Sequence, residues 1–245
     1  MKNFVAKRLK PLLFITIFVA SITSAMQYFN VLQRLEYIAY DWQLTLARQH
    51  KTPPQDVKIV LVDDASLQAM DPVAGDWPWP RSVFADVIDF LAKGKPKAII
   101  FDILFSESET EEQANFSDTR LIEATRNAGN VHHAMLFMTD DGIAPEAAFP
   151  LPTGISRFGA TSINAASVQQ PPLKISHQNE TRLVYNNFLA PVSGLYQAAA
   201  GLGVITKEKD ADGVLRRMTP FFQYQDQYFR ALSTASLSMA DSKSE

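Results

Sequence analysis

The sequence contains no cysteine among its 245 residues, which excludes disulfide bonds and metal sites built from thiolates. It has no low-complexity tract and no repeat of fixed period, so neither a disordered chain nor a repeat array is expected. It also lacks glycine-rich phosphate-binding loops, nucleophile elbows, HExxH pairs and the signatures of kinases and cyclases. We therefore expect no enzyme active site, no cofactor and no bound metal.

Basic residues are scarce outside the start of the chain. The first ten residues hold Lys2, Lys7, Arg8 and Lys10 and no acid, which leaves 19 basic and 26 acidic residues in the remainder. A body this acidic argues against nucleic acid as the main partner. With 47% hydrophobic residues, the chain is long enough and apolar enough to bury a substantial core.

Charged side chains are absent from residues 11–33, directly after the basic cluster. About twenty apolar residues in a helix span the hydrocarbon core of a bilayer. We expect a transmembrane anchor at residues 11–29, with residues 1–10 in the cytoplasm because basic residues favour that side. The rest of the chain would then lie outside the cytoplasm. A cleavable signal peptide, with Thr23 and Ala25 as the small residues before the cut, is the alternative interpretation.

Residues 30–50 predict an amphipathic helix that follows the anchor. Its apolar residues recur at steps of three or four, which places them on one helix face: Val31, Leu35, Ile38, Trp42 and Leu46. One interpretation is a juxtamembrane stalk that pairs with its copy in a homodimer and transmits motion through the membrane. The other is that this face packs on the chain's own domain.

Residues 51–240 predict an α/β domain, and residues 241–245 a polar tail. Apolar strands at 57–62, 97–105 and 130–138 alternate with helices at 65–70, 81–93 and 117–128. Continuous apolar strands separated by helices are typical of a parallel sheet with right-handed crossovers. The predicted fold class is therefore a mostly parallel central sheet flanked by helices.

Beyond about residue 139, prolines divide the chain into shorter pieces that predict an antiparallel C-terminal extension. Strands are expected at 201–205 and 214–224, joined by a hairpin turn at Asp212 and Gly213, with weaker candidates at 158–163 and 181–185. A last helix is expected at 229–240.

Three aspartates follow the predicted strands and are candidate ligand-binding residues: Asp63, Asp64 and Asp102. The carboxyl ends of parallel strands are where open α/β sheets bind ligands. Acids grouped there could hold a divalent cation and support hydrolysis. Alternatively, Asp64 caps the helix that follows it and Asp102 pairs with a cation such as Arg81.

The motif WPWPR, residues 77–81, supplies further candidates. Trp77, Trp79 and Arg81 could form a stacking platform for a ligand, and Phe105 ends the next predicted strand. The alternative is a rigid plug over the end of the sheet, stiffened by the prolines.

Two pairs of neighbouring residues complete the set of candidates. Arg216 could clamp an anion with Arg217, although such a pair is more often one ion-pair partner and one solvated side chain. His132 and His133 lie within a predicted strand and point to opposite faces, so they cannot bind one metal as neighbours.

Taken together, seven motifs resemble the second class of the CHASE family, the cyclases/histidine kinases associated sensory extracellular domains. They are Tyr40-Asp41, IVLVDDASL, WPWPR, KAIIFDILFSE, FSDTRL, GLGVI and DADGVLRR, spread over residues 36–240. The resemblance implies a membrane-anchored sensor on the periplasmic or extracellular side of the cell membrane. In this family the sensor usually precedes further spans and a cytoplasmic nucleotide cyclase, diguanylate cyclase or kinase.

No stimulus follows from the resemblance, so a small molecule or a protein is expected. The chain carries no output domain of its own, which implies a longer polypeptide or a partner chain. The predicted function is a non-enzymatic sensory domain. A metal-dependent hydrolase at the three aspartates and a scaffold for other envelope proteins are the alternatives.

Overall fold

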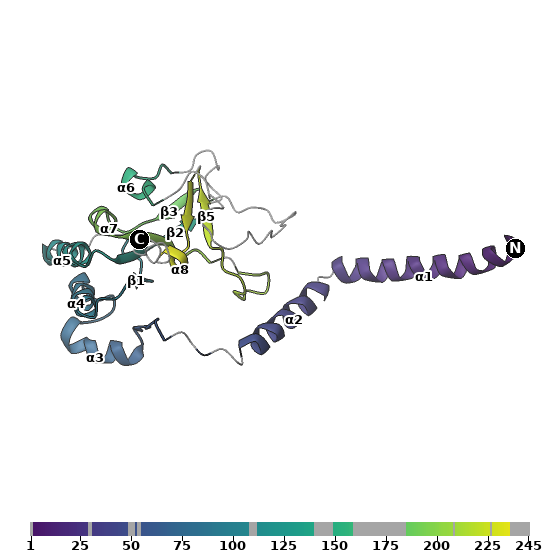
Figure 1. Cartoon of the computed structure of the whole chain (residues 1–245), viewed down its shortest axis with the longest axis horizontal. Coiled ribbons are helices and arrows are strands. Elements are labelled where there is room, and N and C mark those ends of the chain that lie inside the picture. Colours follow the sequence, from purple (N-terminus) through teal and green to yellow (C-terminus); the bar gives the residue numbers. More distant parts are fainter. Residues whose placement is uncertain are drawn as a thin grey trace, which may run out of the picture. The chain divides into compact units, whose positions relative to one another are not determined.

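The structure is a computed structural model that describes residues 2–28, 31–48, 52, 55–107, 112–139, 149–158, 185–207, 209–225 and 227–235. The chain divides into two compact units, Met1–Val60 and Leu61–Glu245 (Figure 1). Each unit is described by itself.

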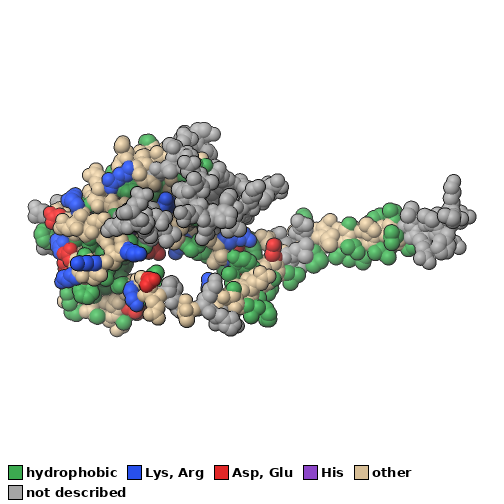
Figure 2. Space-filling model, in the orientation of Figure 1, with side chains coloured by type: hydrophobic (Ala, Val, Ile, Leu, Met, Phe, Trp, Pro, Cys, Tyr) green, Lys and Arg blue, Asp and Glu red, His purple; other side chains and the backbone are tan. Residues whose placement is uncertain are grey.

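The first unit contains the two expected helices, α1 (Lys2–Tyr28) and α2 (Val31–Arg48). The hydroxyl of Thr16 donates to the Leu12 carbonyl one turn earlier, at 2.9 Å, which satisfies a polar group inside an apolar helix. Exposed apolar side chains lie along both helices (Figure 2). Among the residues that the structure describes, no helix is long and apolar enough to cross a membrane.

The second unit is built around β2 (Val131–Met138), the strand with most neighbours in the central sheet. β2 pairs in parallel with β1 (Ile99–Phe101) and β4 (Gly201–Val204), and antiparallel with β3 (Asn187–Leu189). The described strands therefore form a mixed sheet with a parallel centre. A separate antiparallel hairpin joins β5 (Phe221–Tyr224) to β6 (Gln227–Arg230).

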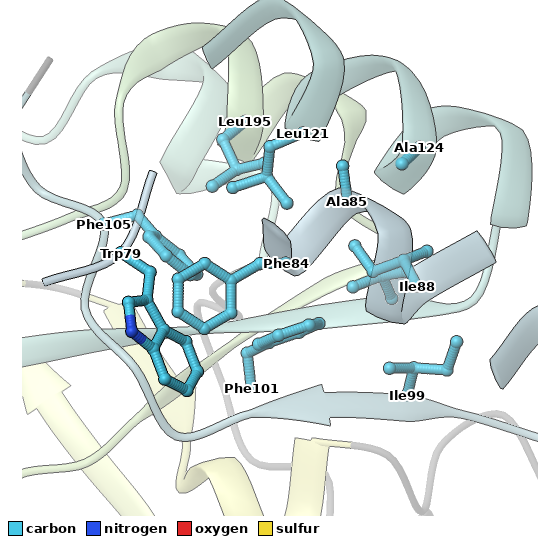
Figure 3. Close-up of a cluster of buried hydrophobic side chains, with 11 residues drawn as sticks. Trp79, Phe84, Ala85, Ile88, Ile99, Phe101, Phe105, Leu121, Ala124 and Leu195 are labelled. Carbon is cyan, nitrogen blue, oxygen red and sulfur yellow. The ribbon is translucent and has the colours of Figure 1, made fainter. Parts of the chain in front are cut away.

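Helices cover one face of the central sheet. α4 (Arg81–Ala92) and α5 (Glu112–Ala128) pack together, and their apolar side chains form one core with alternate residues of the strands. Figure 3 shows Phe84 and Ile88 of α4 above Phe101 and Ile99 of β1. α3 (Asp64–Ala74) adds half-buried side chains to this core, and α7 (Ser193–Ala198) adds the buried Leu195.

A second core joins β2 and β4 to the β5–β6 hairpin. The rings of Phe137 and Tyr224 lie 4.8 Å apart, and Phe229 packs edge-on against Phe137. α6 (Thr153–Ser156) contributes Ile155, and α8 (Leu232–Ala235) lies against β4. A Cβ on Gly203 would come within 2.3 Å of the Leu232 Cα, so only glycine permits this close approach.

The expected first strand is the clearest error among the predictions for the body. Residues 57–62 have no regular secondary structure, and their apolar side chains are exposed, with Ile59 at 78%. Apolar β-branched residues favour an extended backbone, but a strand also needs a partner for its backbone groups. None of the described strands pairs with this segment.

The C-terminal prediction was also wrong in its pairing. Of residues 214–224 only β5 is a strand, and it pairs with β6 rather than with β4. Phe229 and Arg230 belong to β6, so the expected last helix is reduced to α8 within the described residues. The weak strand candidates at 158–163 and 181–185 fall almost wholly outside the described residues. Phe158 lies in a turn, and Tyr185 forms an isolated bridge with Tyr224.

Candidate functional site

The aromatic residues of WPWPR lie largely inside the first core. Trp79 is 7% exposed and packs against Phe84, which in turn meets Phe105 edge-on at 5.3 Å between ring centroids. Trp77 is half exposed and contacts Trp79 edge-on at 5.4 Å. Trp79 and Phe105 therefore form a plug at this end of the sheet. Of the two tryptophans in WPWPR, Trp77 is the one that reaches the surface.

Arg81 pairs with Asp118, and the interpretation that it pairs with Asp102 was wrong. Its Nη1 donates to the Asp118 carboxylate at 2.6 Å, and its guanidinium lies 5.6 Å from the Phe105 ring centroid. Both side chains are almost fully buried. The hydroxyl of Ser117 beside it accepts a 2.8 Å hydrogen bond from the Ser82 backbone N–H.

The predicted start of the helix at Ser117 was also wrong. Ser117 and Asp118 were expected to open a helix, but α5 begins at Glu112 and both residues lie inside it. Both contact the first turn of α4: Ser117 accepts from a backbone N–H that lacks a partner within its own helix, and Asp118 binds the Arg81 side chain. The motifs WPWPR and FSDTRL thus meet in space.

The expectation that Asp64 caps the helix was wrong by one residue, because Asp63 is the N-cap of α3. The Asp63 carboxylate accepts from the Ser66 N–H at 2.9 Å and from the Ser66 hydroxyl at 2.6 Å. These bonds, the hydroxyl bond above all, lower the pKa of Asp63. Asp64 is the first residue of α3. Among the residues that the structure describes, no three His, Cys, Asp or Glu side chains are grouped so as to hold a metal ion.

Arg216 is held by two carboxylates, as the ion-pair interpretation predicted. It donates to Asp210 at 3.1 Å and to Asp212 at 2.8 Å, and its side chain is 6% exposed. The hydrogen bond from Arg216 is the largest cause of the lowered pKa of Asp212. Arg217 is 57% exposed. The expected turn at Gly213 is present, with φ of +83°, although it does not join two paired strands.

The two histidines lie on opposite faces of β2, as predicted. His133 faces the helices, stacks on Phe101 and contacts the Thr125 hydroxyl through Nε2 at 3.1 Å. Burial, with a smaller contribution from His132, lowers the pKa of His133 to about 3. His132 lies over Gly201 on the other face, where burial lowers its pKa as well.

Two residues that the sequence singled out, Asp102 and Arg217, line a cavity. Ile100 and Asp102 alternate with the helix-facing Ile99 and Phe101, so they belong to the opposite face of the sheet. There a cavity of about 230 Å³ is bounded by the end of β1, residues 204–207, Leu215, residues 217–219, Phe222 and residues 231–233. It lies on this face at the carboxyl-terminal parts of β1 and β4, next to the edge at which open α/β sheets bind ligands.

Sequence reasoning missed most of this cavity. Its wall is mainly apolar, and it carries three charged residues: Asp102, Lys207 and Arg217. The segment 214–220 was expected to be a strand. In the structure it is a loop, and its residues Leu215, Arg217 and Met218 line the cavity. Only the structure shows that Ile100, in the middle of an apolar strand, is 45% exposed. An apolar wall with few charges suits ligand binding.

The family model of the CHASE2 domain matches residues 13–245, so the chain belongs to the CHASE2 family. It is therefore a sensory extracellular domain of the kind found in signal transduction proteins. No curated protein and no solved structure matches the chain.

Proposed function

We propose that this chain is the ligand-binding sensory domain of a membrane-anchored signalling protein and has no catalytic activity of its own. The cavity beside Asp102 carries the proposal, because it is a largely apolar hollow at the ligand-binding edge of the sheet. The alternative of a hydrolase with a metal at the aspartates has less support, since Asp63 is engaged as a helix cap.

The proposed anchor is residues 11–29, which would place residues 1–10 in the cytoplasm and the second unit in the periplasm or outside the cell. Support comes from the sequence: residues 11–33 carry no charge, and a basic cluster precedes them. Binding in the cavity would bias α2 and the anchor between two arrangements. A cyclase, diguanylate cyclase or kinase, in the same polypeptide or on a partner chain, would respond.

The absence of cysteine makes the proposed topology directly testable. A single Lys93→Cys change places the only thiol at an exposed position after α4, and Lys7→Cys places it in the basic N-terminal cluster. In spheroplasts, a membrane-impermeant maleimide should label the Lys93→Cys variant at once and the Lys7→Cys variant only after lysis. A Lys93→Cys variant that stays unlabelled until lysis would contradict the proposal.

A further inference from the structure

We infer that the cavity binds a small zwitterion with an apolar body, namely an α-amino acid with an aliphatic side chain. This inference deepens the proposed sensory function and rests on it. Three properties of the cavity carry it: its size and apolar wall, an acid on one side, and two bases that stand apart from that acid.

The apolar part of the cavity comes from five separate segments. Ile100, Val204, Leu215, Phe222 and Leu232 all line it. Its volume of about 230 Å³ is below the roughly 300–1,000 Å³ of sites for drug-sized ligands, so it suits a small metabolite. An aliphatic side chain would cover Ile100 and Leu215, which are 45% and 39% exposed in the structure.

Asp102 supplies the negative charge. It follows β1 directly, on the face away from α4 and α5, and it lines the cavity. Its carboxylate makes no hydrogen bond or ion pair with any residue that the structure describes, unlike Asp63, Asp118 and Asp212. A ligand ammonium group would provide charge-assisted hydrogen bonds for this carboxylate.

Lys207 and Arg217 supply the positive charge from two other segments. Lys207 lies three residues beyond β4, and Arg217 lies in the loop that returns towards β5. Arg217 lies 4.0 Å from Asp210, and a guanidinium can bind a carboxylate through two parallel hydrogen bonds. Neither base forms an ion pair with Asp102 in the described part of the chain.

Separated charges of both signs distinguish a zwitterion from simpler ligands. A monocarboxylate of the same shape would satisfy the bases and leave Asp102 without a partner. An amine of the same shape would satisfy Asp102 alone. An aliphatic amino acid presents an ammonium group, a carboxylate and an apolar chain together, and it can engage all three parts of the cavity.

The test compares L-leucine with its two truncated analogues on the full chain in detergent. The analogues are 4-methylpentanoate, which lacks the ammonium group, and 3-methylbutylamine, which lacks the carboxylate. We expect saturating leucine to raise the melting temperature by a few degrees, and each analogue to give less than a third of that shift. Titration calorimetry should show the same order of affinity.

Variants then assign the charges. Asp102→Asn and Arg217→Gln should each weaken leucine binding at least tenfold, and Lys207→Gln should weaken it less. Asp71→Asn in α3 and Arg126→Gln in α5 are the matched controls, because both are exposed and neither lines the cavity, and they should bind like wild type. The melting temperature without ligand shows that each variant is folded.

Three results would overturn the inference: no aliphatic amino acid shifts the melting temperature, 4-methylpentanoate binds as tightly as leucine, or Asp102→Asn binds like wild type. If a different small molecule binds and depends on Asp102, the ligand class is wrong and the sensory proposal stands. The maleimide labelling decides the membrane topology independently of any ligand.

Discussion

At the scale of single residues, most charged side chains that the sequence singled out are satisfied locally. Arg81 pairs with Asp118 and Arg216 with Asp210 and Asp212, while Asp63 accepts hydrogen bonds from Ser66 of its own helix. Buried charges are stable only with such partners, because leaving water costs several kcal/mol per ion. Asp102 is exposed and makes no such contact with the described residues, so its carboxylate is accessible to a ligand in the cavity.

His133 should make the stability of the domain depend on pH. Its folded pKa of about 3 lies below the ordinary value of 6.5, so the unfolded chain takes up a proton that the folded chain excludes. Stability is therefore complete above pH 6.5 and falls as the pH drops towards 3. The loss from this one residue approaches about 1.4 kcal/mol per pH unit.

Urea unfolding between pH 7 and pH 5 checks this expectation, because most carboxylates remain ionised there. The double variant His133→Leu/Thr125→Val replaces both hydrogen-bonding partners with apolar groups and should flatten the dependence, leaving the smaller contribution of His132. An unchanged slope in the double variant would show that another group causes the pH dependence.

At the scale of elements, α4 and α5 are joined by three ion pairs, one buried and two at the surface. Arg81 and Asp118 are 9% and 13% exposed, whereas Arg120 reaches Asp86 and Asp89 at the surface. Water and salt screen the surface pairs, and burial removes that screening from the other. The two helices are therefore connected mainly through Arg81 and the core beneath it.

Removal of Arg81 should destabilise the domain far more than removal of Arg120. Arg81→Leu leaves Asp118 buried without its partner and should cost about 3 kcal/mol of unfolding free energy. Arg120→Leu should cost about 1 kcal/mol or less. Chemical denaturation measures both, and adding Asp118→Leu to Arg81→Leu should restore part of the loss. Equal costs for the two arginines would contradict the structural assignment.

At the scale of the whole molecule, the apolar face of α2 is notable because its large side chains are exposed. Leu35, Ile38, Trp42 and Leu46 are 51–71% exposed on one side of the helix. Water-exposed apolar stripes of this kind commonly mark interaction surfaces. We propose that two copies of the chain form a dimer through this face. The dimer would bring together two anchors and the two sensory domains that follow them.

Dimerisation through α2 should be sensitive to the face on which a charge is placed. Ile38→Glu introduces a carboxylate on the apolar stripe, and Ala47→Glu introduces the same group about 140° around the helix from Trp42. Light scattering of the detergent-solubilised chain should show a dimer for wild type and for Ala47→Glu. It should show a monomer for Ile38→Glu. A monomeric wild type at micromolar concentration would contradict the proposal.

The features that the sequence alone predicted correctly are those determined by residues close together along the chain. The helices α1, α2 and α4, the strand β2 and the turn at Gly213 all follow from periodicity or turn chemistry within a few residues. The mixed α/β class and the opposite directions of His132 and His133 follow from the same local patterns.

Only the tertiary structure decided the features that depend on distant partners. The apolar pattern of residues 57–62 did not show whether a neighbouring strand would pair with them. The sequence also did not show which acidic residue would form the ion pair with Arg81. The cavity combines β1 with segments more than a hundred residues later. Such contacts arise from chain packing, which short-range propensities do not encode.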